Sequence, residues 1–514
     1  MSHAHVSQMS RRNFIAGAGV AAGAALASGS ALALASEKAD SGAKDAPAAW
    51  DEEADVVIVG FGAAGAAAAI EAHNAGATVC VIEKSGRGGG STFRSGGIIY
   101  MGGGTGLQKD LGIEDTPEGM AAYVKAALGP SSDTELQKIF CDSSIELYDW
   151  CVEQGMVFDG RAEVETHIVE ATEGVSLHYT GNERAYEYAT ITEPVPRGHT
   201  PNGGAPGIFE PMETVVEGFT QPHYNTAAHD LVTDETGAVI GVRATDADGK
   251  EIAVKANKGV VISAGSFAYN DAMIADYNGD YLLCGSRTGN ENDLGDGIRM
   301  GQKVGAATKS MERIAALEFM YLYGDLAAGV MLDYHGFRFL CEDWYGSWIG
   351  REVMERTPDA CFVIIDQPKL DNILTTQYGG HLKPYAQADS IEELAEAIGL
   401  PVDHVVESVE RYNQMCANGE DTDYHKSLEY LKAIETGPFY AMYTTPVMTS
   451  MFTLGGLKIN TKAEVVNYDN EPIPGLYAAG RSSNGIYGEY IGSGSSIADC
   501  LIFGRIAGKS AAAR

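Results

Sequence analysis

The chain has 514 residues, of which 45% are hydrophobic and 21% charged, so it can form a large packed core and is not a disordered chain. Its length predicts two or three domains rather than one. The 36 Lys and Arg residues against 70 Asp and Glu residues give a net charge of −34. That balance disfavours nucleic acid or an anionic membrane as a partner, because both bind basic surfaces.

The first 35 residues are typical of a twin-arginine signal peptide. Arg11 and Arg12 are followed by a charge-free run rich in Ala and Gly, with an A-x-A cleavage site at residues 33–35. We expect export by the twin-arginine route, to the periplasm, the cell envelope or the exterior. An uncleaved N-terminal anchor is the alternative. Residues 36–50 are expected to form a flexible linker.

A dinucleotide-binding fingerprint occupies residues 55–83. A buried β-branched strand over Asp55–Val59 leads into a G-x-G-x-x-G turn and an Ala-rich helix that ends near Ala75. A second strand over Thr78–Ile82 ends at Glu83, which is placed to accept hydrogen bonds from the adenosine ribose. The glycines permit the tight turn and the approach of the backbone to the pyrophosphate, and the N-terminus of the helix supplies amide donors for the phosphates.

The glycine-rich stretch over residues 86–106 favours FAD over NAD. It has too many glycines for an ordinary strand or helix, and it suits a loop that wraps an extended cofactor with serine and threonine hydroxyls as donors. The residues that we predict to bind FAD are Gly60, Gly62, Ala63, Ala64, Gly65, Glu83, Lys84, Gly90, Ser91, Thr92, Ser95, Gly96, Gly97, Ala264, Gly265, Gly480, Arg481, Ser496 and Ile497.

Later segments return to the same strand-to-glycine pattern. Residues 227–264 are typical of a hairpin meander that ends in a buried strand, Pro474–Gly480 repeats the pattern, and Ser495–Ala513 predicts a long apolar helix. The stretch between them is more helical, with one predicted helix over Ile391–Ile398 and another over Asp403–Tyr412.

This order predicts an α/β fold in which the nucleotide-binding domain is split. We assign residues 51–284 and 446–514 to the two parts of that domain and residues 285–445 to an inserted capping domain.

Neither the cysteines nor the histidines show a metal-binding spacing. The eight cysteines form no CxxC or CxxCH pattern, and the twelve histidines form no HxxxH or HExxH pattern. We therefore predict no metal site, no covalent haem and no dense disulfide framework. Any redox chemistry must use another cofactor.

Taken together, these segments resemble the flavoprotein superfamily of fumarate reductases, succinate dehydrogenases and 3-ketosteroid dehydrogenases. The resembling motifs include the fingerprint, the glycine-rich loop, Gly295-Asp-Gly297, Arg411-Tyr-Asn413 and Leu454-Gly-Gly456, and they span nearly all of the mature chain. The resemblance implies bound FAD, a split Rossmann-like FAD-binding domain of the glutathione-reductase type, and an inserted α+β substrate-capping domain.

The chain departs from the fumarate-reducing branch where that branch carries cations. Phe452, Leu317 and Ile491 stand where the resemblance leads us to expect two histidines and an arginine, and Gly346 stands near the expected arginine of the capping domain. A pocket without fixed cations makes the desolvation of a dicarboxylate costly. We therefore expect a substrate that is neutral or singly charged and largely apolar.

The turn Tyr490-Ile-Gly-Ser-Gly494 is similar to the Y-x-G-x-G turn that binds the substrate carbonyl in 3-ketosteroid dehydrogenases. Reaction at a C=C bond next to a ketone exchanges a hydride between the β carbon and flavin N5, and it needs a polarised carbonyl and a proton at the α carbon. The Tyr490 hydroxyl and the Gly494 amide would polarise the carbonyl.

We assign the transfer of this proton to Tyr321 or Tyr323, which lie early in the capping domain, where the enzymes that this chain resembles place a tyrosine. Either side chain could instead pack in the core. Tyr148 and Tyr487 are further candidates for this role. Trp344, Tyr345 and Trp348 form an aromatic cluster that could line an apolar pocket or belong to the core.

We therefore predict an exported FAD-dependent oxidoreductase of the EC 1.3 type that adds or removes hydrogen across a C=C bond conjugated to a carbonyl, as in a 3-ketosteroid-like enone. It would need an external electron donor or acceptor, from a cytochrome or quinone pathway. One alternative is a respiratory, fumarate-reductase-like reductase of an acrylate-type acid, with Arg338, Arg351 or Arg481 as carboxylate ligands. Another is a flavin-binding carrier that has lost the chemistry.

Overall fold

The computed structural model describes residues 49–166, 168, 173–318, 320–356, 361–376, 379–444 and 449–514. The predicted signal peptide and all but the end of the predicted linker lie outside this range. Among the helices of the described residues, none combines the length and the hydropathy that are needed to cross a bilayer.

The largest sheet is built from both halves of the predicted nucleotide-binding domain. Strands from the two halves lie in the order β19 (Glu464–Val466), β20 (Pro472–Ala478), β9 (Glu251–Ile262), β1 (Glu52–Val59) and β2 (Val79–Ile82), and β8 (Val239–Thr245) and β7 (Ala227–Thr233) continue from β9. β1 pairs in parallel with β2 and β9, and β9 pairs in parallel with β20. The predicted meander is the antiparallel run β7–β8–β9, and the predicted α/β class is confirmed.

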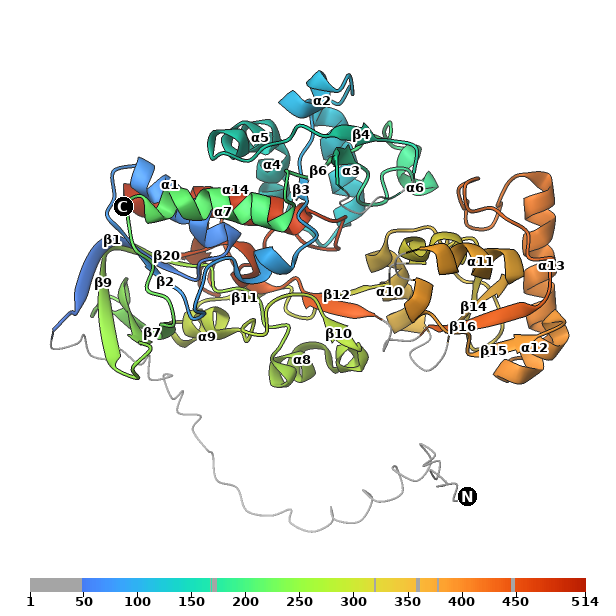
Figure 1. Ribbon diagram of the computed structural model, residues 1–514. Helices are drawn as coiled ribbons and strands as arrows, with labels where there is room; N and C mark the ends of the chain where they lie inside the picture. The colour runs from blue at the N-terminus through green and yellow to red at the C-terminus, as the bar shows by residue number, and fades with distance from the viewer. Residues whose placement is uncertain are drawn as a thin grey trace, which may run out of the picture. The chain divides into compact units, whose positions relative to one another are not determined.

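Two helices from opposite ends of the chain lie side by side against this sheet (Figure 1): α1 (Ala63–Asn74) and α14 (Ser495–Ala513). Their backbones approach closely because both surfaces consist of small residues. A Cβ atom at Gly504 would come within 2.4 Å of the Ala64 carbonyl oxygen, and one at Gly508 within 2.2 Å of the Ala68 carbonyl oxygen. Helix α7 (Ala205–Glu217) also packs against α1.

The glycine-rich stretch that we predicted as a loop contains short ordered elements. The 3-10 turn η2 (Gly90–Arg94) and strand β3 (Ile99–Tyr100) lie within it, and α2 (Gly106–Asp110) begins at its end, where Thr105 and Gln108 form a capping box. Glycines with positive φ, such as Gly97 at +72°, separate these pieces.

Strand β3 opens a second, smaller sheet in the order β3, β6 (Gly198–His199), β5 (Val175–His178) and β4 (Arg161–Glu163). A fully buried ion pair between Arg197 and Asp115, 2.7 Å apart, lies beside it. The helices of this region are α3 (Pro117–Leu128), α4 (Thr134–Asp142), α5 (Ser144–Glu153) and α6 (Tyr186–Ala189).

The predicted capping region has its own sheet and two apolar clusters of its own, which bury residues such as Ile365 and Val409. Its strands lie in the order β13 (Val330–Leu332), β14 (Cys361–Asp366), β16 (Phe439–Thr444) and β15 (Ala386–Ala388), with helices α10 (Gly346–Arg356), α11 (Gln367–Thr375), α12 (Ile391–Ile398) and α13 (Val402–Asn418). Helices α12 and α13 contain the two predicted helical segments. Figure 1 shows these elements together at the right.

Buried residues between positions 285 and 317, such as Ile298 and Ile314, belong to the core of the first domain. The boundary that we placed at residue 285 is therefore earlier than the first residue of the separate clusters, Met320.

The remaining elements belong to one of the two domains or lie between them. They are α8 (Asp271–Asn278), α9 (Asp296–Lys303), the sheet β10 (Ser286–Arg287), β17 (Ser450–Thr453) and β12 (Ile314–Leu317), the pair β11 (Thr308–Lys309) and β18 (Gly456–Leu457), and the 3-10 turns η3 (Gly279–Leu283), η4 (Met320–Leu326), η5 (Gly379–His381) and η7 (Gly480–Ser482).

The close contact between α1 and α14 predicts that one methyl group added at Gly508 lowers the stability of the protein. Gly508→Ala should destabilise the protein by about 1–3 kcal/mol, because the new Cβ overlaps backbone that cannot move without separating the helices. The thermal midpoint measures this effect. Gly279→Ala is the matched control, since a Cβ at that position meets no atom within 4 Å and should leave the midpoint unchanged. Equal midpoints for both variants would contradict the close approach of the helices.

Candidate active site

The turn between β1 and α1 accepts only glycine at two of its positions. Gly60 has a φ of +99°, and a Cβ there would lie 2.5 Å from the Ser263 carbonyl oxygen. A Cβ at Gly65 would lie 2.0 Å from the Gly60 carbonyl oxygen, so this glycine sets how closely the helix packs on the turn. The Thr92 hydroxyl accepts a hydrogen bond from the Ala63 amide at 3.0 Å and so joins the glycine-rich stretch to the start of α1.

Glu83 is held at the end of β2 by backbone donors. Its Oε2 accepts from the Phe61 amide at 2.8 Å, and its Oε1 accepts from the Ser85 amide at 2.7 Å. The neighbouring Lys84 pairs with Asp296 at 3.0 Å. The carboxylate is therefore fixed beside the glycine turn, which is the position expected of a group that binds the adenosine ribose.

A cavity of about 560 Å³ runs along the carboxyl ends of these parallel strands, and its size is typical of a cofactor and substrate site. Gly65, Gly97 and Gly480 do not line it, because they lie where chain segments cross. The predicted FAD-binding residues that line it are Gly60, Gly62, Ala63, Ala64, Glu83, Lys84, Gly90, Ser91, Thr92, Ser95, Gly96, Ala264, Gly265, Arg481, Ser496 and Ile497. Glycine backbone, a helix N-terminus, hydroxyls and a fixed carboxylate fit FAD.

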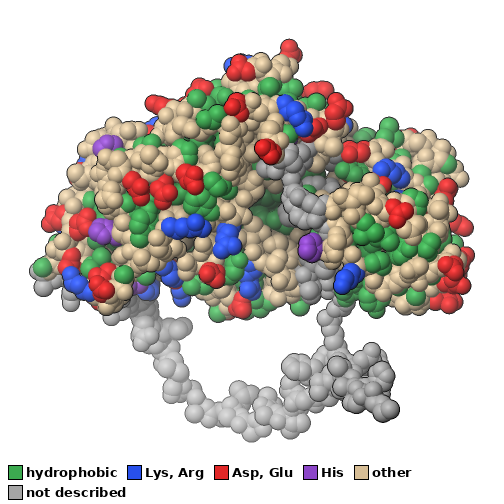
Figure 2. Space-filling model, in the orientation of Figure 1, with side chains coloured by type: hydrophobic (Ala, Val, Ile, Leu, Met, Phe, Trp, Pro, Cys, Tyr) green, Lys and Arg blue, Asp and Glu red, His purple; other side chains and the backbone are tan. Residues whose placement is uncertain are grey.

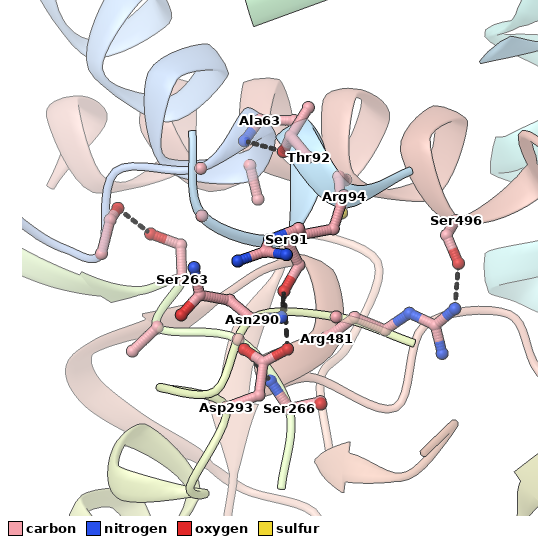
Figure 3. A pocket seen from close by; sticks show the side chains of 18 of the residues that line it. Ala63, Ser91, Thr92, Arg94, Ser263, Ser266, Asn290, Asp293, Arg481 and Ser496 are labelled. Carbon is pink, nitrogen blue, oxygen red and sulfur yellow. Dashed lines mark hydrogen bonds between the residues drawn. The ribbon is translucent and has the colours of Figure 1, made fainter. Parts of the chain in front are cut away.

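Residues that the sequence reasoning missed complete the polar part of this cavity. The carboxylate of Asp293 accepts a hydrogen bond from the Ser91 hydroxyl at 2.6 Å, and the Asn290 amide donates to the same hydroxyl at 2.8 Å (Figure 3). Burial raises the pKa of Asp293. Ser263 and Ser266 also line the cavity. The nearest sequence signal was the Gly295-Asp-Gly297 segment, which begins directly after Leu294.

Tyr490 and Gly494 line the same cavity, as the carbonyl-binding prediction requires. Gly494 has a φ of +90° at the N-terminus of α14, and a Cβ there would lie 2.8 Å from the Tyr100 amide nitrogen. Around Tyr490 the surface is largely apolar and aromatic. The ring of Phe452 packs edge-on against Tyr490, with 4.7 Å between centroids, and Leu317 lies on the same cavity surface.

Arg481 lies at this end of the cavity, but its guanidinium is already engaged. It donates to the Thr453 carbonyl and to the Ser496 hydroxyl, and Figure 3 shows the side chain extended toward Ser496. Its charged carbon lies 4.4 Å from the ring centre of Phe452 and 5.8 Å from that of Tyr490. The cation is therefore held by backbone, hydroxyl and rings.

Of the two tyrosines predicted to move the proton, Tyr323 is not among the described residues that line the cavity. Tyr323 lies in η4 and packs against an apolar cluster of the capping region, because its chain turns away from the cavity after Leu317. The side chain of Tyr321 lies outside the described residues. The capping-region tyrosine that does line the cavity is Tyr345, whose hydroxyl lies 3.0 Å from that of Ser493. The sequence showed Tyr345 only as a member of an aromatic cluster.

Two arginines suggested as carboxylate ligands are engaged elsewhere and do not line the cavity. Arg338 pairs with Glu342 and Asp421, both at 2.7 Å, inside the capping region. Arg351 lies 3.3 Å from Glu352 and 3.6 Å from Glu489.

A buried acid lies behind the turn that carries Tyr490. Asp499 on α14 is 1% exposed, and burial raises its pKa to about 7, although Arg481 and the Ile486 amide oppose the shift. Burial, together with the charge that Asp499 carries when it is ionised, raises the pKa of Tyr487. The neutral acid is therefore the form that the fold favours at this position.

Comparison with known proteins gives consistent similarities. A family model described as an FAD binding domain matches residues 55–497. The urocanate reductase of Eggerthella lenta is 30% identical over 501 residues, which cover 93% of this chain and 77% of that protein. The fumarate reductase (cytochrome) of Shewanella frigidimarina is 28% identical over 472 residues, which cover 89% of this chain and 77% of that protein.

Among solved structures, the 3-ketosteroid-Δ4-(5α)-dehydrogenase from Rhodococcus jostii RHA1, in complex with 4-androstene-3,17-dione, is similar to this chain along its length. It has 36% sequence identity and a TM-score of 0.85, and the match covers 90% of this chain and 98% of that one.

These similarities confirm the predicted flavoprotein superfamily with its 3-ketosteroid dehydrogenase-like branch, FAD as the cofactor, and an FAD-dependent oxidoreductase that acts on CH–CH groups. They also confirm the predicted FAD-binding fold. The roles of individual residues and the export of the protein stay predictions.

The buried acid predicts a pH dependence of stability. Asp499 keeps its proton in the folded state up to about pH 7, whereas the unfolded chain loses it near pH 4, so this group lowers stability as the pH rises between these values. Asp499→Asn mimics the neutral acid and should gain on the order of 2 kcal/mol relative to the parent protein between pH 5 and pH 8. Thermal midpoints measured across this range test the difference. Asp403→Asn, at an exposed position of α13, is the control and should follow the parent protein. A thermal midpoint of Asp499→Asn that runs parallel to that of the parent protein across this range would refute the assignment.

Proposed function

We propose that this FAD-dependent oxidoreductase, which belongs to the FAD binding domain family, adds or removes hydrogen across the C=C bond of an apolar enone of the 3-ketosteroid type. The observation that carries the proposal is the apolar surface around Tyr490, in the same cavity as the FAD-binding residues. The similarity to a 3-ketosteroid-Δ4-(5α)-dehydrogenase supports this class of substrate.

Four positions where a fumarate reductase would need cations support the proposal. Phe452 and Leu317 line the cavity, and Ile491 is buried directly after Tyr490. The Gly346 carbonyl accepts a hydrogen bond from the amide of Glu318, which directly follows Leu317. Gly346, the fourth of these positions, therefore adjoins the same surface. A dicarboxylate would be desolvated here without a cation at any of these positions, which costs several kcal/mol for each charge.

The cations that do line the described cavity are Lys84, Arg94 and Arg481. Lys84 is paired with Asp296 beside Glu83, and Arg94 belongs to the glycine-rich stretch. Arg481 is the cation near Tyr490, and its donors are used by protein acceptors. One ordered cation suits a substrate with at most one negative charge.

The residues of this chain then take distinct parts in the reaction. The Tyr490 hydroxyl and the Gly494 amide hold and polarise the ketone oxygen, while bound FAD supplies the hydride exchange with the β carbon. Tyr345, whose hydroxyl adjoins Ser493 on the cavity surface, is the described capping-region tyrosine in position to hold the α-carbon proton. Tyr321 remains a candidate for the same part.

A second candidate function is the reduction of an acrylate-type acid. The observation that favours it is Arg481, which could bind one carboxylate if it released Ser496. The 30% identity to a urocanate reductase supports it as well.

We also propose that the protein is exported through the twin-arginine segment and exchanges electrons with an external donor or acceptor, such as a cytochrome or quinone pathway. The support is the pattern at Arg11 and Arg12 and the name of one relative, a fumarate reductase that uses a cytochrome.

Anaerobic oxidation of a reduced viologen dye by the FAD-loaded protein separates the two functions. We expect turnover with a 3-keto-4-ene steroid and none with fumarate, because the cavity lacks the cations that a dicarboxylate needs. A cinnamate-type acid is the third substrate in the comparison. Turnover with the acids but not with the steroid would overturn the proposal and select the acrylate-type reaction.

Tyr490→Phe should lower the turnover of the steroid by roughly 100-fold while FAD stays bound, because one of two donors to the developing oxyanion is lost. Tyr468→Phe is the control, since this tyrosine is 75% exposed and should leave turnover unchanged. Flavin absorbance confirms equal cofactor content in both variants. An unchanged rate in Tyr490→Phe would remove this residue from the mechanism.

A further inference from the structure

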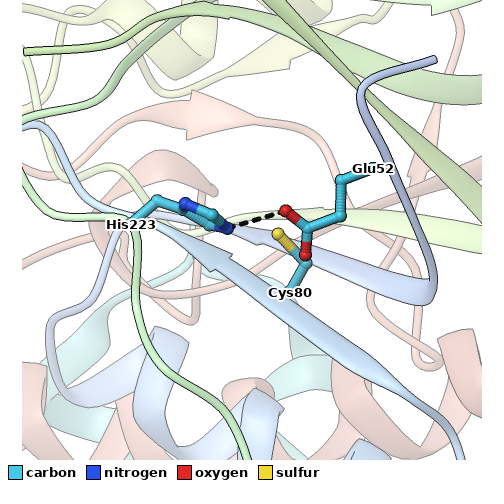
Figure 4. Close-up of side chains that lie close together, drawn as sticks. All are labelled: Glu52, Cys80 and His223. Carbon is cyan, nitrogen blue, oxygen red and sulfur yellow. Dashed lines mark ion pairs between the residues drawn. The ribbon is translucent and has the colours of Figure 1, made fainter.

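Three side chains of different chemistry meet at the edge of the largest sheet, away from the cavity described above (Figure 4). Glu52 is the first residue of β1, Cys80 lies within β2, and His223 lies on the segment that runs beside β2. One ligand atom from each lies within 4.8 Å of the others, and the His223 Nε2 is 2.8 Å from a Glu52 carboxylate oxygen. We propose that Glu52, Cys80 and His223 bind a zinc ion.

The donor set and its spacing support zinc in particular. A thiolate, an imidazole and a carboxylate are the groups that bind zinc in proteins, and three protein ligands with one water molecule form a common site. Tetrahedral zinc with these ligands places the donor atoms about 3.3–3.8 Å apart. All three donor atoms lie within 4.8 Å of one another, and the Glu52–His223 separation of 2.8 Å is shorter than that range, so small rotations of Glu52 and His223 would bring all three donors into reach.

The surroundings combine a rigid base with an open side. Cys80 is 1% exposed and lies in a strand that pairs in parallel with β1. The side chains of His223 and Glu52 are 38% and 42% exposed, so the ion and its water can enter from solvent. His223 is itself held to β2, because its amide donates to the Val81 carbonyl at 2.8 Å and its carbonyl accepts from the Glu83 amide at 2.9 Å.

The site would join three chain segments beside the FAD cavity. The segment that carries His223 continues to Thr226, which lines the cavity and whose amide donates to the Glu83 carbonyl at 2.9 Å. Zinc that ties His223 to β1 and β2 would therefore restrain the segment that supports Glu83. We expect bound zinc to raise the thermal midpoint and to slow the release of FAD.

No spacing motif indicates this site, because its residues are 28 and 143 positions apart in the chain. It therefore departs from our prediction of no metal, which depended on local histidine and cysteine spacing. The triad depends on the pairing of β1 with β2 and on the return of the chain after α7.

Native mass spectrometry of the full-length, FAD-loaded protein tests the proposal. After treatment with a chelator and addition of one equivalent of Zn²⁺, we expect one zinc ion per chain. Cys80→Ser and His223→Gln should each weaken zinc binding more than about 100-fold, as measured by competition with a chromophoric chelator, since even indirect changes around zinc cost about 10–100-fold. Zinc should slow FAD release in the parent protein but in neither variant.

Two controls and a variant of the third ligand make the result specific to the triad. Cys416→Ser changes a half-buried cysteine outside the triad and should bind zinc as the parent does. The double variant His3→Gln, His5→Gln removes the histidines near the N-terminus and should also bind normally. Glu52→Gln removes the exposed carboxylate ligand with little risk to folding and should also weaken zinc binding. Flavin absorbance checks the fold of every variant. The proposal would be overturned if the parent protein bound no zinc, or if Cys80→Ser and His223→Gln bound zinc as tightly as the parent protein does. The Glu52–His223 contact would then be an ion pair only.

Discussion

The close packing of α1 on α14 is the constraint on which the rest of the site depends. Helix α1 begins at the glycine turn of the fingerprint, and α14 begins at Gly494, so the contact between these helices brings both N-termini to one cavity. Gly504 and Gly508 permit this because their missing side chains let the two backbones approach. The cofactor half and the proposed carbonyl-binding half of the site are thus positioned together, although more than 400 residues separate them.

The two ends of the cavity differ in the polarity of the side chains that line them. At the cofactor end, Glu83 and Asp293 are buried and each accepts hydrogen bonds, so polar groups are held ready for a polar ligand. At the other end, Phe452, Leu317 and Tyr345 surround Tyr490. A substrate carbonyl that enters this end would meet the Tyr490 hydroxyl and the Arg481 cation among apolar and aromatic side chains. A low local dielectric strengthens these interactions and makes unpaired charge costly.

Sequence patterns within short segments were sufficient to predict those parts of the fold that depend on neighbouring residues in the chain. The fingerprint, helix α12 and the long helix α14 follow from glycine spacing, helical periodicity and apolar length, so they were predicted from the sequence. Asp293 and Tyr345 were not assigned to the site, because an acid in a loop and a tyrosine among tryptophans acquire their roles only through tertiary contacts. The position of Tyr323 away from the cavity could not be predicted for the same reason: its place early in the capping region does not reveal in which direction the 3-10 turn points its side chain.

Hydrogen bonds between the capping region and the first domain link the positions that set the charge of the substrate in the proposed function. The Ser347 hydroxyl donates to the Tyr490 carbonyl at 3.0 Å, and the Tyr345 amide donates to the Asn182 side-chain oxygen at 2.6 Å. The start of α10 is therefore tied both to the turn that carries Tyr490 and to the region of the second sheet.

The four positions that lack cations lie on β12, on β17, at the start of α10 and beside Tyr490. A single histidine or arginine introduced at one of them would be buried without an anionic partner, and a carboxylate substrate alone would be desolvated against too few cations. Neither the new cation in the protein nor the carboxylate in the substrate is favourable without the other. The apolar character of this surface is therefore a property of four segments together, and exchange of one residue is not sufficient to give a dicarboxylate site.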